Sequence, residues 1–259
     1  MWDTLLGMLH LAPDSFPTRY LAIAVPIHAS AALLAGIVLC PLAIFARKGT
    51  RLHRVAGYAL QIDVVVIVAT SFLLLIDRQV DELVVQASVF PNGAYERLYL
   101  GLLSIVFAYY CFSGLRVWYR LPPPGKDQVT SNWIDWGLAT AGLLVAITYI
   151  VTSIVTLGNG NPLSLVYIQA AILLIAFTLF DFYTFFYPPN PARFPWWLVH
   201  MAKMILLWII LIRFIILRVL EPDVSTFAIH QAIGLLLYVG ICAAAAFYFR
   251  RRFRESRAV

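Results

Sequence analysis

Long apolar stretches alternate with short polar connections along most of the chain. Seven of these stretches are long enough to cross a bilayer as a helix, which takes about 20 apolar residues. Prolines, glycines and charged residues separate them. The predicted spans are 20–45, 53–76, 95–118, 134–157, 163–186, 195–219 and 225–249. The pattern therefore predicts an all-α, polytopic membrane protein with seven transmembrane helices.

The composition narrows the class of protein further. Hydrophobic residues make up 62% of the chain and charged residues 12%, whereas soluble domains average about 25% charged residues. This excludes a soluble enzyme and a nucleic-acid partner, and it leaves the lipid bilayer as the expected surroundings. Because the spans fill most of the 259 residues, we expect one integral membrane domain. Its parts would be an interfacial N-terminal segment, a seven-helix bundle and a basic tail, at 1–19, 20–249 and 250–259.

Lys and Arg are unevenly distributed between the two sets of connections. Thirteen of them lie in one set, at 46–54, 116–133, 187–194 and 250–259. Only four lie in the opposite set, at 1–19, 77–97, 158–162 and 218–224. Loops rich in Lys and Arg stay in the cytoplasm. We therefore expect the N-terminus outside and the C-terminus in the cytoplasm.

Four histidines lie within the predicted spans and fall into two pairs by depth. An ionisable side chain at membrane depth costs at least about 2.5 kcal/mol, so each needs a partner or a function. From the helical rise, His28 and His230 lie about 12 Å and 8 Å below the outer surface. His53 and His200 lie within about 8 Å of the cytoplasmic surface. Each pair therefore combines two different helices at similar depth.

Such pairs suit haem b, which needs two neutral imidazoles facing each other across the porphyrin. Two sites, one in each leaflet, would carry electrons across a bilayer of about 30 Å in two short steps. The pattern thus predicts a membrane-embedded b-type cytochrome that exchanges electrons with a quinone pool. Its ligands would be His28 with His230 and His53 with His200. Hydrogen-bonded packing or proton handling is the alternative for each histidine.

Three further charged residues inside the spans define a candidate proton or polar pocket. Asp181 and Lys203 lie on adjacent spans, where they would form a buried ion pair. Alternatively, with His200 on the same helical face as Lys203, they would line a pocket for a quinol head group, a proton or an anion. Asp63 lies near mid-bilayer, where it would either orient His28 or form a proton relay with it.

Two other functions remain open. Zinc bound by His53, His200 and either Asp181 or Asp135 would indicate an intramembrane hydrolase, since three protein ligands plus water are needed. A non-catalytic role, as a subunit of a larger membrane complex or as a proton-coupled transporter, would use the same intramembrane charges. The sequence does not decide whether the protein is an enzyme.

Residues 28–58 carry a short motif. His28 is followed by the basic turn Arg47-Lys48 and then by His53-Arg54-Val55-Ala56-Gly57-Tyr58. In this the chain resembles a group of bacterial multi-helix membrane proteins with a first-helix His and a His-Arg-x-x-Gly-Tyr motif. The resemblance implies a multi-pass protein of the bacterial inner (plasma) membrane and no particular activity. The arrangement of one histidine pair in each leaflet is also similar to that of transmembrane di-haem b-type cytochromes. In those proteins the ligands are separated by other numbers of residues.

Overall fold

The computed structural model describes residues 19–76, 93–120, 130–158, 163–188 and 196–220, together with residues 233, 234, 236, 238–240 and 243. Every regular element in this part of the chain is a helix. The elements are α2 (Arg19–Leu33), η2 (Leu34–Leu39), α3 (Cys40–Phe45), α4 (Arg51–Ile76), α6 (Gly93–Tyr119), α7 (Trp133–Gly158), α8 (Leu163–Phe186) and α9 (Trp196–Leu220).

Six helical segments are long and apolar enough to cross a membrane. The first runs through α2, η2 and α3 without a break, and the others lie in α4, α6, α7, α8 and α9. The boundaries of these helices agree with the first six predicted spans to within two residues. Most of the seventh predicted span, the predicted interfacial segment up to residue 18 and the tail at 250–259 lie outside the described residues. An all-helical, polytopic membrane protein is therefore confirmed at the level of six helices.

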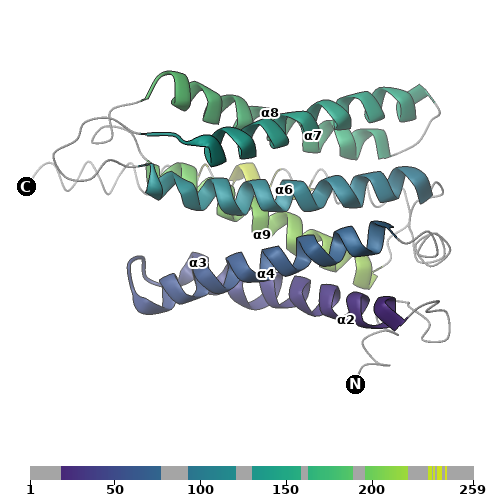
Figure 1. Ribbon diagram of the computed structural model, residues 1–259, viewed down its shortest axis with the longest axis horizontal. Coiled ribbons are helices and arrows are strands. Elements are labelled where there is room, and N and C mark those ends of the chain that lie inside the picture. The colour runs from purple at the N-terminus through teal and green to yellow at the C-terminus, as the bar shows by residue number, and fades with distance from the viewer. Residues whose placement is uncertain are drawn as a thin grey trace, which may run out of the picture.

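The helices run side by side, and α6 is the central one (Figure 1). It packs against α4, α7 and α9, while α7 and α8 form an antiparallel pair. The turn at 46–50, the ends of α6 and α8 and the starts of α7 and α9 share one end of the bundle, at the left of Figure 1. We call it the basic end, after Arg47, Lys48, Arg51, Arg116 and Arg120.

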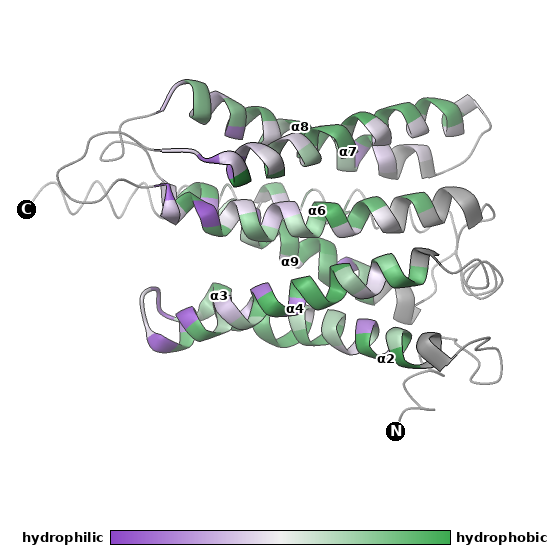
Figure 2. Cartoon of the chain, viewed as in Figure 1, coloured by the Kyte–Doolittle hydropathy of each residue, from purple (hydrophilic) through white to green (hydrophobic). Residues whose placement is uncertain are grey.

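Apolar side chains cover the outside of the bundle. On α4 they include Val55, Ile62 and Val65, each more than half exposed. On α7, Leu144 and Ile154 are likewise exposed. Figure 2 shows hydrophobic residues along the length of the helices and hydrophilic residues gathered toward the basic end. A soluble protein rarely exposes so much apolar surface, so these faces are suited to contact with lipid.

The first span contains a π-helical turn, η2, that is completed by α9. The amide of Cys40 donates to the carbonyl of Ala35, five residues back. In the same register the Gly36 carbonyl would accept from residue 41, but Pro41 has no N–H. Trp208 of α9 donates its indole N–H to that carbonyl instead, at 2.8 Å. A buried carbonyl that the local sequence leaves unpaired is thus satisfied by a distant helix.

Helix α7 begins at a reciprocal cap. The Asn132 side-chain oxygen accepts from the backbone amides of Ile134 and Asp135, and the Asp135 carboxylate accepts from the amide of Asn132. Arg116 of α6 donates its Nε and Nη2 to the two oxygens of the same carboxylate, at 2.6 and 3.0 Å. Asp135 therefore both caps α7 and joins α7 to α6.

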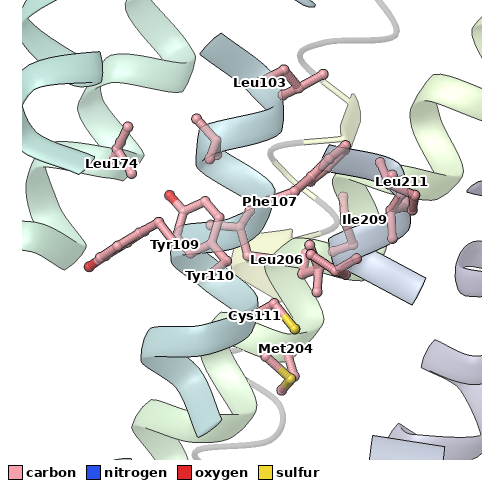
Figure 3. Packing of buried hydrophobic residues seen from close by; sticks show 14 of the residues in the cluster. Leu103, Phe107, Tyr109, Tyr110, Cys111, Leu174, Met204, Leu206, Ile209 and Leu211 are labelled. Atoms are coloured by element: carbon pink, nitrogen blue, oxygen red, sulfur yellow. The ribbon is translucent and has the colours of Figure 1, made fainter. Parts of the chain in front are cut away.

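The core lies around the middle of α6 (Figure 3). Phe107, Tyr110 and Cys111 of α6 are buried there, with Met204 and Leu206 of α9 among their neighbours in the cluster. Nearer the basic end α6 and α9 approach closely at Gly114. A Cβ at that position would lie 3.1 Å from the Cβ of Lys203. Glycine at position 114 therefore lets α9 bring the Lys203 side chain against α6.

Candidate functional site

The most strongly polar group inside the bundle is an ion pair between α8 and α9. The Lys203 Nζ lies 2.6 Å from Oδ2 and 2.8 Å from Oδ1 of Asp181. The exposed fractions of the two residues are 0% for Lys203 and 2% for Asp181. Two oppositely charged groups so far from water are stable only when paired and hydrogen-bonded. The structure thus contains the buried ion pair between Asp181 and Lys203, which was one of the two interpretations of the sequence.

Helix α6 supplies further partners to the pair. The Tyr109 hydroxyl donates to Asp181 Oδ2 at 2.8 Å, and Lys203 donates to the Ser113 hydroxyl at 3.1 Å. Tyr109 and Ser113 are one helical turn apart, so they lie on one face of α6. The Lys203 Nζ also lies 5.1 Å from the centroid of the Tyr109 ring. Three helices are therefore joined through one carboxylate and one ammonium group.

A second cation, Arg120, lies beside the same carboxylate. Its Nη2 is 3.8 Å from Asp181 Oδ1, and its Nη1 donates to the Thr184 hydroxyl at 3.4 Å. Phe185 and Trp196 pack against the guanidinium. Burial lowers the pKa of Arg120, while the Asp181 carboxylate acts in the opposite direction. We refer to Asp181, Lys203, Tyr109, Ser113, Arg120 and Thr184 as the charge cluster.

The sequence did not predict four of these six members. Tyr109 looks like a packing aromatic, and Ser113 and Thr184 are small polar residues of the kind that pack in membrane helices. Arg120 precedes a run of three prolines and resembles a connection residue. Only the helix pairing shows that these residues converge on Asp181.

His200 lies on the same helix as Lys203 but is not hydrogen-bonded to the charge cluster. Its Nδ1 lies 2.9 Å from the backbone carbonyl of Gly114 on α6, and its ring packs edge-on against Trp118. The polar pocket predicted for Asp181, His200 and Lys203 is thus divided between an ion pair and a separate histidine. Both parts are held against neighbouring residues of α6, Ser113 and Gly114.

His53, at the basic end of α4, has a similar environment. Its Nδ1 lies 2.8 Å from the backbone carbonyl of Ala43, near the end of α3. His53 and His200 are close enough for a charge on one imidazole to act on the other. The structure therefore places the two histidines of the predicted inner pair at the same end of the bundle.

Both hydrogen bonds define the same tautomer. A carbonyl oxygen can only accept, so Nδ1 of His53 and of His200 must carry the proton. In the neutral ring, Nε2 then holds a lone pair. Within the described part of the chain neither Nε2 has a hydrogen-bond partner. An imidazole held through Nδ1–H by a carbonyl, with the Nε2 lone pair available, is the form that ligates metals in proteins.

The predicted outer pair is only partly described. The Nδ1 of His28 lies 2.9 Å from the hydroxyl oxygen of Thr70 on α4. The Thr70 hydroxyl also lies within hydrogen-bonding distance of the Val66 and Ile67 carbonyls of its own helix. The predicted partner, His230, lies outside the described residues.

Asp63 does not orient His28. The carboxylate has no hydrogen bond to that histidine, whose Nδ1 is bonded to Thr70 instead. Asp63 is 8% exposed, and its buried Oδ2 has no hydrogen-bond partner among the described residues. The direct His28–Asp63 interaction expected from sequence is therefore not formed, because Thr70 lies beside His28 and occupies its Nδ1.

The ligand set proposed for zinc is not assembled either. In the described part of the chain, no group of three His, Cys, Asp or Glu side chains is close enough to hold a metal ion. The two carboxylates considered for that role are engaged elsewhere, Asp135 with Arg116 and Asp181 with Lys203. Among the described residues, the two histidines at the basic end thus have no carboxylate to complete a set of three ligands.

Comparison with known proteins adds no relative: no family model, curated protein or solved structure matches the chain.

Proposed function

We propose that the protein is a membrane-embedded b-type cytochrome in which His53 and His200 are the axial ligands of one haem. The observation that carries this proposal is the shared state of the two imidazoles. Each is held through Nδ1 by a backbone carbonyl, and neither Nε2 has a hydrogen-bond partner in the described chain. A haem bound there would supply one-electron transfer, and two such histidine ligands are the usual requirement of haem b.

Neighbouring residues would hold both histidine rings in the orientation for ligation before the haem binds. The Ala43 and Gly114 carbonyls orient the rings and favour the neutral tautomer that can donate to iron. Trp118 packs against His200 and restricts rotation of its ring. His28 with His230 would form a second, outer site, and a quinone is the proposed electron donor or acceptor.

The proposal includes the arrangement in the membrane. The distribution of Lys and Arg supports seven spans with an outer N-terminus and a cytoplasmic C-terminus, and it favours a cytoplasmic location for the basic end. We propose the bacterial inner membrane from the resemblance of residues 28–58. The described residues of the seventh stretch support a further helix, since they are helical and Tyr238 is buried in the core. A reporter enzyme fused to the C-terminus would test this by its activity on the cytoplasmic side.

Absorption spectra of the detergent-purified protein, before and after reduction with dithionite, test the cytochrome proposal. We expect a reduced α-band of the b type. His53→Ala and His200→Ala should each remove one haem or convert it to a high-spin form, because one axial ligand is lost. His28→Ala is the matched control, since it should leave the haem at the basic end unchanged. If His53→Ala and His200→Ala both kept the full haem content and unchanged spectra, this would contradict the proposal.

A proton-coupled transporter is the second candidate, and one observation favours it. Asp63 is a buried carboxyl group in the middle of a membrane-crossing helix, with no partner for Oδ2 among the described residues. Carboxyl groups in this position commonly bind protons in transporters and pumps. Uptake of a radiolabelled substrate by proteoliposomes, driven by a pH gradient and lost in Asp63→Asn, would support this candidate over electron transfer.

A further inference from the structure

Asp63 lies close to the midpoint of the span formed by α4. The membrane-crossing segment runs from Arg51 to Leu74, so by the helical rise Asp63 is about 16–18 Å from either end. Its neighbours Leu60, Val64 and Ile67 on the same helix are all fully buried. The carboxyl group is therefore about as far from both membrane surfaces as this helix allows.

In the part of the chain that the structure describes, no charged group is paired with Asp63. The helices packed against α4 are α2, α3 and α6, together with η2. The titratable side chain that interacts with Asp63 from them is the thiol of Cys40, which in turn lies near Cys111 of α6. Within the described residues, Asp63 has no ion pair and no hydrogen bond to its buried Oδ2. Among the cations of the α6–α8–α9 region, Arg120 and Lys203 are directed at Asp181, and Arg116 is paired with Asp135.

An unpaired carboxylate in an apolar interior carries a large desolvation cost, whereas the protonated acid does not. A buried guanidinium cannot give up its charge, but a carboxyl group can lose its charge by binding one proton. We propose that Asp63 is a proton-binding site at the midplane of the membrane, neutral in the resting protein and able to exchange its proton. The ligand is H⁺ itself. This site stands whether or not haem binds at the basic end.

On the side of Asp63 toward the basic end, the Gln61 side chain of α4 is hydrogen-bonded to the Gly57 carbonyl, and on the side away from the basic end the next polar residue is Thr70. Thr70 is seven residues, two helical turns, beyond Asp63 and so on the same face, about 10 Å along the axis. Thr70 is hydrogen-bonded to His28 of α2, and the Ser71 hydroxyl lies 3.5 Å from the same imidazole nitrogen. The imidazole of His28 is therefore a titratable group at this interface, two helical turns from Asp63 along the axis of α4.

Infrared spectroscopy of the full-length protein in lipid nanodiscs tests the proposal. At neutral pH we expect a C=O stretching band of a protonated carboxylic acid, absent in Asp63→Asn. The band should shift when H₂O is replaced by D₂O. It should persist in the control Asp181→Asn/Lys203→Met, because Asp181 is ion-paired and contributes a carboxylate band instead.

Two results would overturn the proposal. One is a difference between wild type and Asp63→Asn that contains carboxylate bands and no acid band, which would mean that Asp63 is ionised. The other is an acid band that does not shift in D₂O, which would mean that its proton is locked in the fold. If Asp63→Asn does not fold, wild type labelled with carboxyl carbon-13 aspartate gives the same decision, since the label shifts any aspartic acid band.

Discussion

Asp181 and Asp63 are both carboxyl groups buried inside membrane-crossing helices, yet their surroundings differ in every respect that affects charge. Asp181 receives hydrogen bonds from Lys203 and Tyr109 and has Arg120 nearby. Asp63 interacts with the Cys40 thiol, and its buried Oδ2 has no hydrogen-bond partner among the described residues. Asp181 is thus ion-paired, whereas Asp63 is the carboxyl group that we propose to bind a proton.

The difference shows how each carboxyl group contributes to the protein. Asp181 joins α6, α8 and α9 and would be costly to disturb, because any change leaves Lys203 without its counter-charge. Asp63 forms no hydrogen bond or ion pair that joins two of the described helices, so these contacts do not explain its presence in a costly position. A buried polar residue without a structural partner is where a function is expected.

The largest effect is expected from Asp181→Asn. The substitution keeps the shape of the side chain but leaves the fully buried Lys203 ammonium without a counter-ion. Breaking a buried ion pair in this way costs about 3–5 kcal/mol. Unfolding in mixed detergent micelles should show this loss in the free energy of unfolding, or the variant should fail to accumulate. The double variant Asp181→Asn/Lys203→Met is the control and should recover most of it. Stability unchanged in the single variant would mean that the pair is not formed.

A smaller effect is expected from Asp135→Asn. The bidentate hydrogen bond with Arg116 is lost, but that side chain is 21% exposed and water can solvate its charge. The asparagine oxygen can still accept from the amide of Asn132, which preserves part of the cap. We expect a loss of about 1–2 kcal/mol in the same unfolding measurement. A loss as large as that of Asp181→Asn would show that exposure does not separate the two ion pairs.

The smallest effect is expected from Asp63→Asn. If Asp63 is protonated, the substitution exchanges one neutral polar group for another of nearly the same shape. At a pH below about 4, where the aspartic acid is protonated in the unfolded chain as well, the free energy of unfolding should then change by less than about 1 kcal/mol. If Asp63 is protonated in the folded protein, the free energy of unfolding of wild type should fall relative to that of the variant as the pH rises and Asp63 ionises. If wild type instead gained stability relative to the variant at higher pH, Asp63 would be stabilised as a carboxylate, and the contrast with Asp181 would be wrong.

The six helices could be predicted closely from the sequence because each is a long apolar segment bounded by charge or proline. The limits of α8, predicted at 163–186, are those observed. Departures from regular α-helical geometry within a helix could not be predicted from apolar segments and their boundaries. The π-helical turn at Leu34–Leu39 depends on Pro41 together with a donor 172 positions away, which no local pattern contains.

The candidate site was predictable only for residues whose charge is conspicuous in an apolar stretch. Asp181 and Lys203 could be paired because they lie at similar depths on adjacent spans. The partners of the histidines could not be predicted, since two of them are backbone carbonyls, at Ala43 and Gly114. Every residue has such a carbonyl, so only the crossing of two helices selects the one that is used.

The hydrogen bond from Trp208 to Gly36 also bears on how the protein is made. The two residues are 172 positions apart in the chain, and ribosomes add about 5–20 residues per second. The first helix therefore waits roughly 10–35 seconds in the membrane, with the Gly36 carbonyl lacking its final donor, before α9 is even synthesised. Until then that carbonyl needs another partner, such as water at the insertion machinery. The helix that contains Gly36 is thus inserted well before its hydrogen bonding is complete, because the donor is supplied by a helix made much later.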